Sequence, residues 1–389
     1  MANVSSSNGL EKRPKLRFPG FDEPYRTTLL GEIASLVNRT DPKSNAPIMM
    51  LSAGNGFIMQ SEKYSRDNAG QSLKKYILLK QGELAYNHGA SKVKQFGCCY
   101  ELTEPEARIP YVYHCFKINE DEYTPYVAMA LNNAKMDQQL KRLVSSSVRM
   151  DGLLNISFED YMSVTLHLPS FIEQKHIADF LTKLDERIAY QERLITSLKK
   201  YKRGAIVYIL SGKTNKFAAE ASWTEKTLAD LCCEFRSGRN ISASRIHETG
   251  EYAVYGGNGI RGYCDHYNHE GEYVVVGRQG ALCGNVRLIQ GKNYLSEHAI
   301  AVRANDENDT KFLLFLLDFM KLGQYSDQGA QPGLAVNKLL KLKCTVPDKK
   351  TQSRIASFLL NIDLQIYNHE KMLSLLVDQW KAFLQQLFI

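Results

Sequence analysis

The sequence predicts an α/β (α+β) protein built as a pseudo-twofold tandem repeat. Two similar globular units are expected, separated by a long antiparallel two-helix coiled coil. Two observations carry this prediction. First, the stretch that begins at Pro169 recurs without a gap at Pro347, 178 residues later. Second, apolar residues in both copies advance by alternating fours and threes, which is typical of a coiled coil. An ungapped repeat of this length indicates duplication.

The repeated stretch predicts two long helices, because each copy follows a proline and contains no internal proline. A helix over 177–209 would run roughly 50 Å. A polar residue interrupts each apolar seam at equivalent positions, Gln191 and His369, and we expect these to face each other or nearby turns. Two unrelated amphipathic helices in separate cores are the alternative, but they would not explain the shared register. The candidate helix-pairing residues are Ile177, Leu181, Leu184 and Ile188 in the first copy and Ile355, Leu359, Ile362 and Ile366 in the second.

The order of elements divides the chain into four segments. These are a globular segment (1–168), a helix (169–212), a second globular segment (213–346) and a second helix (347–389). Short strand-like runs are predicted in both globular segments, and in each segment they are followed by one helix and then a loop. The expected strands are 76–79, 83–86, 97–102, 111–118, 272–276, 285–289 and 299–303, and the expected helices are 125–143 and 312–322. The stretches 161–168 and 342–346 lead into Pro169 and Pro347.

Composition sets outer bounds on what the chain can be. At 389 residues, with 44% hydrophobic and 23% charged residues, it has the profile of a globular protein of two to four domains. The net charge of +7 permits a nucleic-acid partner without establishing one. Eight cysteines without a Cys-x-x-Cys pattern favour a reducing cytoplasm, and no apolar run reaches the roughly 18 residues of a membrane span. We therefore expect a cytoplasmic protein with no membrane association.

Active-site patterns are missing from the sequence. It has no G-x-x-x-x-G-K-[ST] phosphate loop, no Gly-rich loop of methyltransferase type, and no carboxylate pair beside Asp348 for a metal-dependent nuclease. The spacing Cys264-x-His266-x-x-His269 resembles metal ligands but lacks a fourth partner. We predict no catalytic residue, no metal and no bound cofactor in this chain.

Two glycine-rich stretches in the second globular segment are the candidate nucleic-acid contacts. Residues 255–263 read YGGNGIRGY and residues 277–285 read GRQGALCGN. Glycine lets backbone approach another surface, and Arg, Gln and Asn carry the groups that read base edges. The alternative is that these glycines only form hairpin turns. The candidate residues are Tyr255, Asn258, Arg261, Arg278, Gln279 and Asn285 here, and Tyr86, Asn87, Lys92 and Lys94 in the first segment, with loops 145–149 and 327–331 flanking them.

These features resemble the specificity (S) subunit of Type I restriction–modification enzymes over essentially the whole chain. The strongest carriers are the two helix starts, which share Pro-x4-Gln-x2-Ile-Ala-x-Phe-Leu-x3-Asp-x2-Ile at 169–188 and 347–366. The stretches 255–263 and 277–284 resemble one class of target recognition domain. The first domain, with GELAYNHGAS at 82–91, resembles another class.

The resemblance implies a DNA-reading protein that is not itself an enzyme. Each target recognition domain would read one half of a bipartite, asymmetric double-stranded DNA site. The helices would set the spacing and dock two modification subunits, which would bring S-adenosylmethionine and methylate adenine. Restriction–translocase subunits would join with ATP and Mg for cleavage. The alternatives are a coiled-coil scaffold that binds only proteins and a stand-alone enzyme with an unrecognised site.

Overall fold

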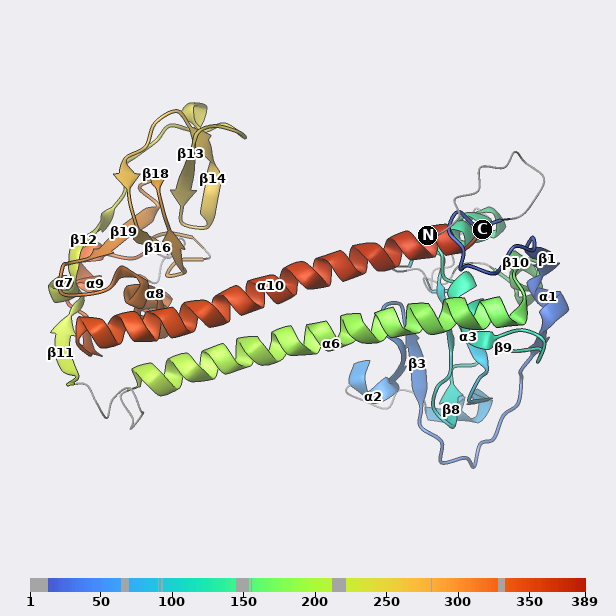
Figure 1. Cartoon of the computed structure of the whole chain (residues 1–389). Helices are drawn as coiled ribbons and strands as arrows, with labels where there is room; N and C mark the ends of the chain where they lie inside the picture. The colour runs from blue at the N-terminus through green and yellow to red at the C-terminus, as the bar shows by residue number, and fades with distance from the viewer. Residues whose placement is uncertain are drawn as a thin grey trace. The chain divides into compact units, whose positions relative to one another are not determined.

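The computed structural model describes residues 13–63, 70–89, 91, 94–144, 154, 156–211, 222–280, 282–327 and 333–389. The chain forms two compact units. The first comprises Met1–Tyr190 with Leu373–Ile389, and the second comprises Gln191–Met372. Each unit therefore contains one globular part and a stretch of both long helices, α6 (Phe171–Leu210) and α10 (Lys349–Leu387) (Figure 1).

The globular part of the first unit is centred on a four-stranded antiparallel sheet of order β2-β9-β6-β7. Three further antiparallel pairs, β1-β10, β3-β4 and β5-β8, complete its strands. Its elements are β1 (Arg26–Leu29), α1 (Leu30–Ile33), β2 (Ala34–Leu36), β3 (Met49–Ser52), β4 (Gly56–Met59), α2 (Gln60–Lys63), η1 (Gly70–Lys75), β5 (Ile77–Lys80), β6 (Leu84–Asn87), β7 (Cys98–Glu101), β8 (Glu106–Ile109), β9 (His114–Ile118), α3 (Thr124–Ala130), α4 (Ala134–Leu143), α5 (Phe158–Met162) and β10 (Thr165–Leu168).

The second unit repeats this plan with a sheet of order β12-β19-β16-β17. A strand pair, β11-β20, again precedes the long helix. A second sheet, β14-β13-β18-β15, includes one parallel pairing between β13 and β18. Its elements are β11 (Thr224–Thr227), α7 (Leu228–Leu231), β12 (Cys232–Ser237), η2 (Ala243–Arg245), β13 (Tyr252–Gly256), β14 (Gly259–Cys264), β15 (His269–Glu270), β16 (Tyr273–Gly277), β17 (Val286–Ile289), β18 (Lys292–Leu295), β19 (Ala299–Ala304), α8 (Thr310–Phe319), η3 (Leu322–Tyr325), α9 (Val336–Leu339) and β20 (Lys343–Val346).

Duplication is thus visible in the topology as well as in the sequence. The shared parts are the strand pair beside the long helix, a short helix, the four-stranded sheet and one helix packed near it. The parts that differ are β3, β4, β5 and β8 in the first unit and β13, β14, β15 and β18 in the second. The common elements form a scaffold, and the remaining strands distinguish the two globular parts.

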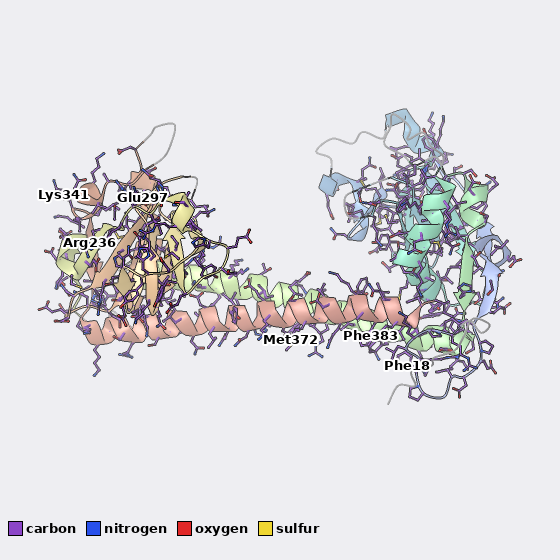
Figure 2. All side chains as sticks on the ribbon, turned by 90° about the horizontal axis from the view of Figure 1, so that it is seen from above. Phe18, Arg236, Glu297, Lys341, Met372 and Phe383 are labelled. Carbon is purple, nitrogen blue, oxygen red and sulfur yellow. The ribbon has the colours of Figure 1, made fainter. Side chains whose placement is uncertain are left out.

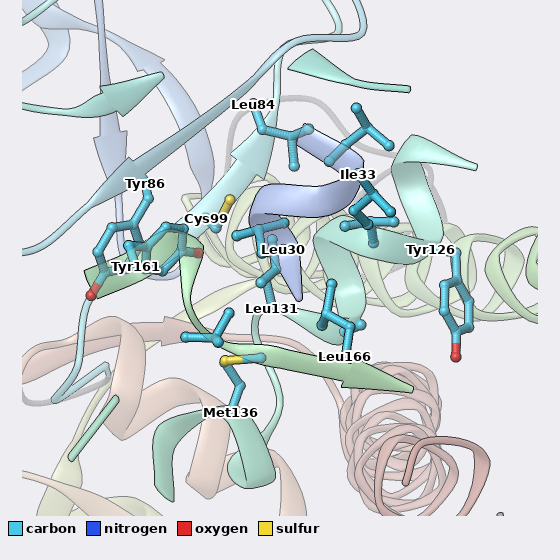
Figure 3. Close-up of a cluster of buried hydrophobic side chains, with 14 of the residues drawn as sticks. Leu30, Ile33, Leu84, Tyr86, Cys99, Tyr126, Leu131, Met136, Tyr161 and Leu166 are labelled. Carbon is cyan, nitrogen blue, oxygen red and sulfur yellow. The ribbon is translucent and has the colours of Figure 1, made fainter. Parts of the chain in front are cut away.

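The long helices pair in opposite directions within each unit. In the first unit Ile177 and Leu181 of α6 share a buried core with Leu387 and Phe388 at the end of α10. Figure 3 shows another part of this core, where Leu30 of α1 lies near Leu131 and Leu166. In the second unit, late α6 residues meet early α10 residues, including Ile206, Ile209, Ile355, Leu359, Ile362 and Ile366. The predicted antiparallel helices are confirmed, and the alternative of unrelated helices is wrong.

The seam residues near the helix ends do more than pair the helices. Ile177 and Leu181 also pack into the globular core of the first unit, as Ile355 and Leu359 do in the second. Leu184 and Ile188 are half-buried. The first unit adds aromatic contacts, since the Phe180 ring lies 5.6 Å from that of Phe18 and 5.0 Å from that of Phe383. Phe18 and Phe383 are labelled in Figure 2.

Gln191 and His369 meet, as the sequence predicts. The side-chain nitrogen Nε2 of Gln191 lies 2.7 Å from Nδ1 of His369 and donates to the His369 carbonyl oxygen at 3.0 Å. These residues occupy equivalent positions in the two repeats. Polar pairing at a seam position fixes the register of a coiled coil. Two ion pairs on the same stretch, Lys199–Glu370 and Lys202–Asp363, support that register.

A second equivalent pair, Gln174 and Gln352, ties each long helix to its globular part. Both side chains are 1% exposed. Gln174 accepts a hydrogen bond from the backbone of Tyr123, the residue before α3, and donates to the carbonyl oxygen of Pro169. Gln352 accepts from the backbone of Asp309, the residue before α8, and donates to the carbonyl oxygen of Pro347. The duplication is therefore preserved down to individual hydrogen bonds.

One expected helix differs from the structure. The single helix predicted over 125–143 is two helices, α3 and α4, separated at Leu131–Asn133. The side-chain oxygen of Asn133 accepts hydrogen bonds from the backbone of Lys135 and Met136, which caps the start of α4. Asn at this position satisfies the free amide groups of a new helix and so favours a break.

Candidate nucleic-acid interface

The first glycine-rich stretch of the second unit is a tight hairpin. Gly256 at the end of β13 pairs with Gly259 at the start of β14, which leaves a two-residue turn, Gly257–Asn258. Gly259 has φ of +100°, which glycine adopts readily. A Cβ atom on Gly257 would lie 2.5 Å from the carbonyl oxygen of Gln279, so no larger residue fits there.

The second glycine-rich stretch is a closed loop between β16 and β17. The backbone of Gly277 donates to the carbonyl oxygen of Asn285, and the backbone of Gly284 donates to that of Gly277, both at 2.8 Å. A Cβ atom on Gly277 would lie 2.3 Å from the carbonyl oxygen of Gly257. The two stretches therefore pack backbone against backbone. These glycines serve the turns, as the alternative interpretation holds, and they also bring the two stretches together.

Their meeting point forms a polar pocket of about 170 Å³. Three of the candidate residues line it: Tyr255, Asn258 and Asn285. Asn258 and Asn285 are exposed, whereas Tyr255 is half-buried and packs against the core beneath β16. The exposed amides offer both donors and acceptors, which suits the reading of base edges.

Arg287 also lines this pocket, although it is not among the residues predicted from the sequence. It is exposed on β17, and its guanidinium lies over Gly259, 2.8 Å from where a Cβ atom would stand. Strand alternation would not have selected it, because Arg287 is exposed whereas Ile289, two residues later on the same face of β17, is buried. Asp318 from α8 contributes a carboxylate to the same lining.

The other three candidates of this unit have different settings. Arg261 is exposed on β14, and its aliphatic chain crosses Gly256. Arg278 is half-buried and directs its guanidinium at the carbonyl oxygens of Leu334 and Glu297. The side-chain oxygen of Gln279 lies 2.6 Å from Nδ1 of His298. Arg278 and Gln279 thus hold their loop in place, while Arg261 keeps its guanidinium at the surface.

In the first unit, Tyr86 is a core residue and not the surface contact with DNA that the sequence predicts. It is 1% exposed, its ring stacks on Tyr161 at 3.8 Å, and its hydroxyl donates to the carbonyl oxygen of Phe96. Burial raises the pKa of this hydroxyl well above its usual range. The reason is that β6 lies inside the four-stranded sheet, where both faces are covered.

The remaining candidates of the first unit are mostly engaged locally. Asn87 is half-buried and accepts a hydrogen bond from the backbone of Gly89. The ammonium group of Lys94 donates to the carbonyl oxygen of Asn132 at 2.7 Å. Lys92 lies outside the described residues, as do the loop 145–149 and most of the loop 327–331.

The residues with metal-like spacing have separate partners. The thiol of Cys264 contacts the carbonyl oxygen of His266, and the His266 ring faces Asp265. His269 is buried between Asn268 and Glu234, and burial lowers its pKa. Over the described ranges no three His, Cys, Asp or Glu side chains are grouped to hold a metal ion. The same ranges contain no helix of the length and hydropathy that crossing a bilayer requires.

Fold and surface together define a class of protein, a duplicated scaffold that presents a different polar surface from each copy. Residues 220–376 match the family described as Type I restriction modification DNA specificity domain. The chain is 43% identical over 148 residues to the specificity subunit of the Type I restriction enzyme EcoprrI of Escherichia coli. It is 28% identical over 134 residues to a putative Type I specificity subunit of Mycoplasma pneumoniae. These alignments span 37% and 44% of the length of those relatives, and 37% and 33% of this chain.

Solved structures share the fold over nearly the whole chain. A Type I restriction–modification S subunit from M. genitalium covers 97% of this chain and 99% of its own, with a TM-score of 0.67 at 17% identity. A chain from a study of complex assembly and conformational transition of the Type I system covers 95% of this chain, with a TM-score of 0.54 at 16% identity. This chain shares the fold of Type I specificity subunits, and its residues 220–376 match the DNA specificity domain of that family.

Proposed function

We propose that this chain is the DNA sequence-recognition subunit of a Type I restriction–modification complex. Each globular part would read one half of a bipartite, asymmetric site in double-stranded DNA. The observation that carries the proposal is the duplicated scaffold with dissimilar surfaces. The sheet order and the Gln174 and Gln352 contacts repeat, whereas the glycine-lined pocket of the second unit has no counterpart in the sequence of the first.

In this proposal the chain performs no chemistry itself. The helices set the spacing between the half-sites and dock two modification subunits, which bring S-adenosylmethionine and methylate adenine. Restriction–translocase subunits, ATP and Mg complete the cleaving complex. The complex would act on the chromosome in the cytoplasm. Lys and Arg contacts with phosphate would supply most of the affinity, and base-edge contacts the specificity.

Within the second unit, we assign base reading to the exposed residues of the pocket. Asn258, Asn285 and Arg287 stand at its rim, and Arg261 lies on the adjoining strand. An arginine can contact guanine and an asparagine can contact adenine through two hydrogen bonds each, with about 1–3 kcal/mol of discrimination per contact. The close backbone contact between Gly257 and Gly277 brings the two stretches that carry these side chains together.

The test is an exchange of one globular part at a time, followed by sequencing of methylated positions. Replacing 27–169 with the corresponding region of a relative should change one half-site and leave the other unchanged. Replacing 224–347 should do the reverse. If neither exchange alters the methylated sequence, the chain does not read DNA and the scaffold alternative gains support.

A finer test uses Arg287→Ala, with Arg193→Ala as the matched control. Arg193 is also exposed and in the second unit, but it lies on α6. Loss of Arg287 should relax the methylated sequence at one position of one half-site. An unchanged methylated sequence would remove Arg287 from the reading surface.

A further inference from the structure

A larger pocket, of about 600 Å³, lies in the first unit. It is bounded by the β3–β4 hairpin, β7, α3 and both long helices. Its walls combine aromatic and acidic side chains, among them Phe57, Tyr100, Glu101, Asp185 from α6 and Trp380 from α10. A concave site with apolar walls and a few polar groups is the usual form of a small-molecule site. This pocket is distinct from the DNA-reading surface proposed for the second unit.

The internal repeat shows which group is missing from this pocket. Asp185 is equivalent to Asp363, and Trp380 is equivalent to Lys202. In the second unit the Lys202 ammonium lies 2.5 Å from the Asp363 carboxylate and 5.4 Å from the centre of the Phe315 ring. The second unit therefore places a cation between a carboxylate and an aromatic ring.

In the first unit an indole replaces that lysine. No lysine or arginine among the described residues pairs with Asp185. The Trp380 indole N–H lies beside Asp185 and acts to lower the pKa of its carboxyl group. Desolvation by the surrounding protein is the larger effect and raises the pKa of Asp185, although the residue is exposed at the pocket. The carboxylate thus stands beside aromatic walls without the cation that its counterpart has.

The charges of the other lining residues favour a positive ligand. Glu101 is half-buried in the same wall, and burial raises its pKa. Glu104 adds a third carboxylate. Among the described lining residues the cationic side chain is Lys94, whose ammonium is already bonded to the carbonyl oxygen of Asn132. The lining thus contains three carboxylates and one ammonium group, and that ammonium group is already hydrogen-bonded.

We propose that this pocket binds an aliphatic diamine or polyamine. One ammonium group takes at Asp185 the place that Lys202 takes at Asp363, against the Trp380 ring. The alkyl chain lies along the aromatic wall, and the second ammonium group pairs with Glu101. Charge-assisted contacts of this kind are stronger than neutral ones, and an ammonium over an indole gains further attraction.

Trp380 supplies the probe, because the chain has two tryptophans and Trp223 is the other. In the full chain carrying Trp223→Phe, free of nucleic acid, the fluorescence of Trp380 is titrated with putrescine at constant ionic strength. We expect a saturable change that potassium chloride does not produce. Asp185→Asn should weaken putrescine binding about tenfold, which corresponds to about 1.4 kcal/mol. Asp363→Asn, the matched control in the second unit, should leave the affinity unchanged.

Two further arms test the details by calorimetry. Trp380→Lys recreates the arrangement of the second unit, so its own ammonium should occupy Asp185 and abolish binding. Butylamine, with a single ammonium group, should bind more weakly than putrescine. The proposal is overturned if Asp185→Asn binds putrescine as tightly as the parent chain, or if potassium chloride gives the same fluorescence change. Equal affinities for butylamine and putrescine would overturn the role of Glu101.

Discussion

Replacing Gln352 with alanine should destabilise the second unit far more than an equivalent change elsewhere on α10. The side-chain oxygen of Gln352 accepts from the backbone of Asp309 at 3.0 Å. Its nitrogen donates to Asn308 at 2.8 Å and to the carbonyl oxygen of Pro347 at 2.9 Å. Gln352 is 1% exposed, so all three hydrogen bonds are made away from solvent. Each lost bond costs about 1 kcal/mol, so Gln352→Ala should lower the free energy of unfolding by about 3 kcal/mol.

The assay can follow each unit separately, because Trp223 lies in the second unit and Trp380 in the first. In a Trp380→Phe background, urea unfolding monitored by Trp223 fluorescence reports the second unit. Gln365→Ala is the matched control, since Gln365 is an exposed glutamine on the same helix. Hydrogen exchange at the Asp309 amide supplies a local measurement, because this amide loses its acceptor. A loss below about 0.5 kcal/mol, or unchanged protection of that amide, would refute the reasoning.

Three more outcomes follow from single residues. Gly277→Ala should destabilise the second unit by about 1–3 kcal/mol, because the new Cβ atom would lie 2.3 Å from the Gly257 carbonyl oxygen. An unchanged urea midpoint would contradict this close packing. Gly204→Ala should instead stabilise by about 0.5–1 kcal/mol, because Gly204 is in the interior of α6 and nothing lies within 4 Å of the new atom; thermal unfolding checks the sign. Exposed Cys233 should react with iodoacetamide in the folded chain at pH 8, whereas buried Cys98 should not, because burial raises the pKa of its thiol to about 11. Mass spectrometry of the peptides measures both reactions, and faster labelling of Cys98 would contradict this prediction.

The sequence was most informative where a pattern repeats over a long distance. The heptad spacing predicts both long helices, and the shared register predicts that Gln191 meets His369. These features depend on periodicity, which a single sequence carries in full. The boundary between α3 and α4 is harder to predict, because one capping residue, Asn133, decides it.

Side-chain exposure in the globular parts depends on strand order, which local patterns do not contain. Tyr86 is a residue type that can contact DNA, but it lies in β6, which has a strand on each side, and its side chain is buried. Arg278 and Lys94 carry the right charge, yet each is bonded to backbone carbonyls from distant residues. Arg287 was missed because its neighbour across the pocket, Gly259, comes from another strand pair.

In the proposed function, the tight glycine contacts in the second unit separate the residues that fix the fold from those that would contact DNA. Gly257 and Gly277 fix the path of the main chain, and neither offers a side chain to a ligand. Asn258 and Arg287, in contrast, present exposed side chains. If these two residues read bases as proposed, changes at them would alter the DNA preference while the backbone beneath stays intact, so single codon changes would suffice.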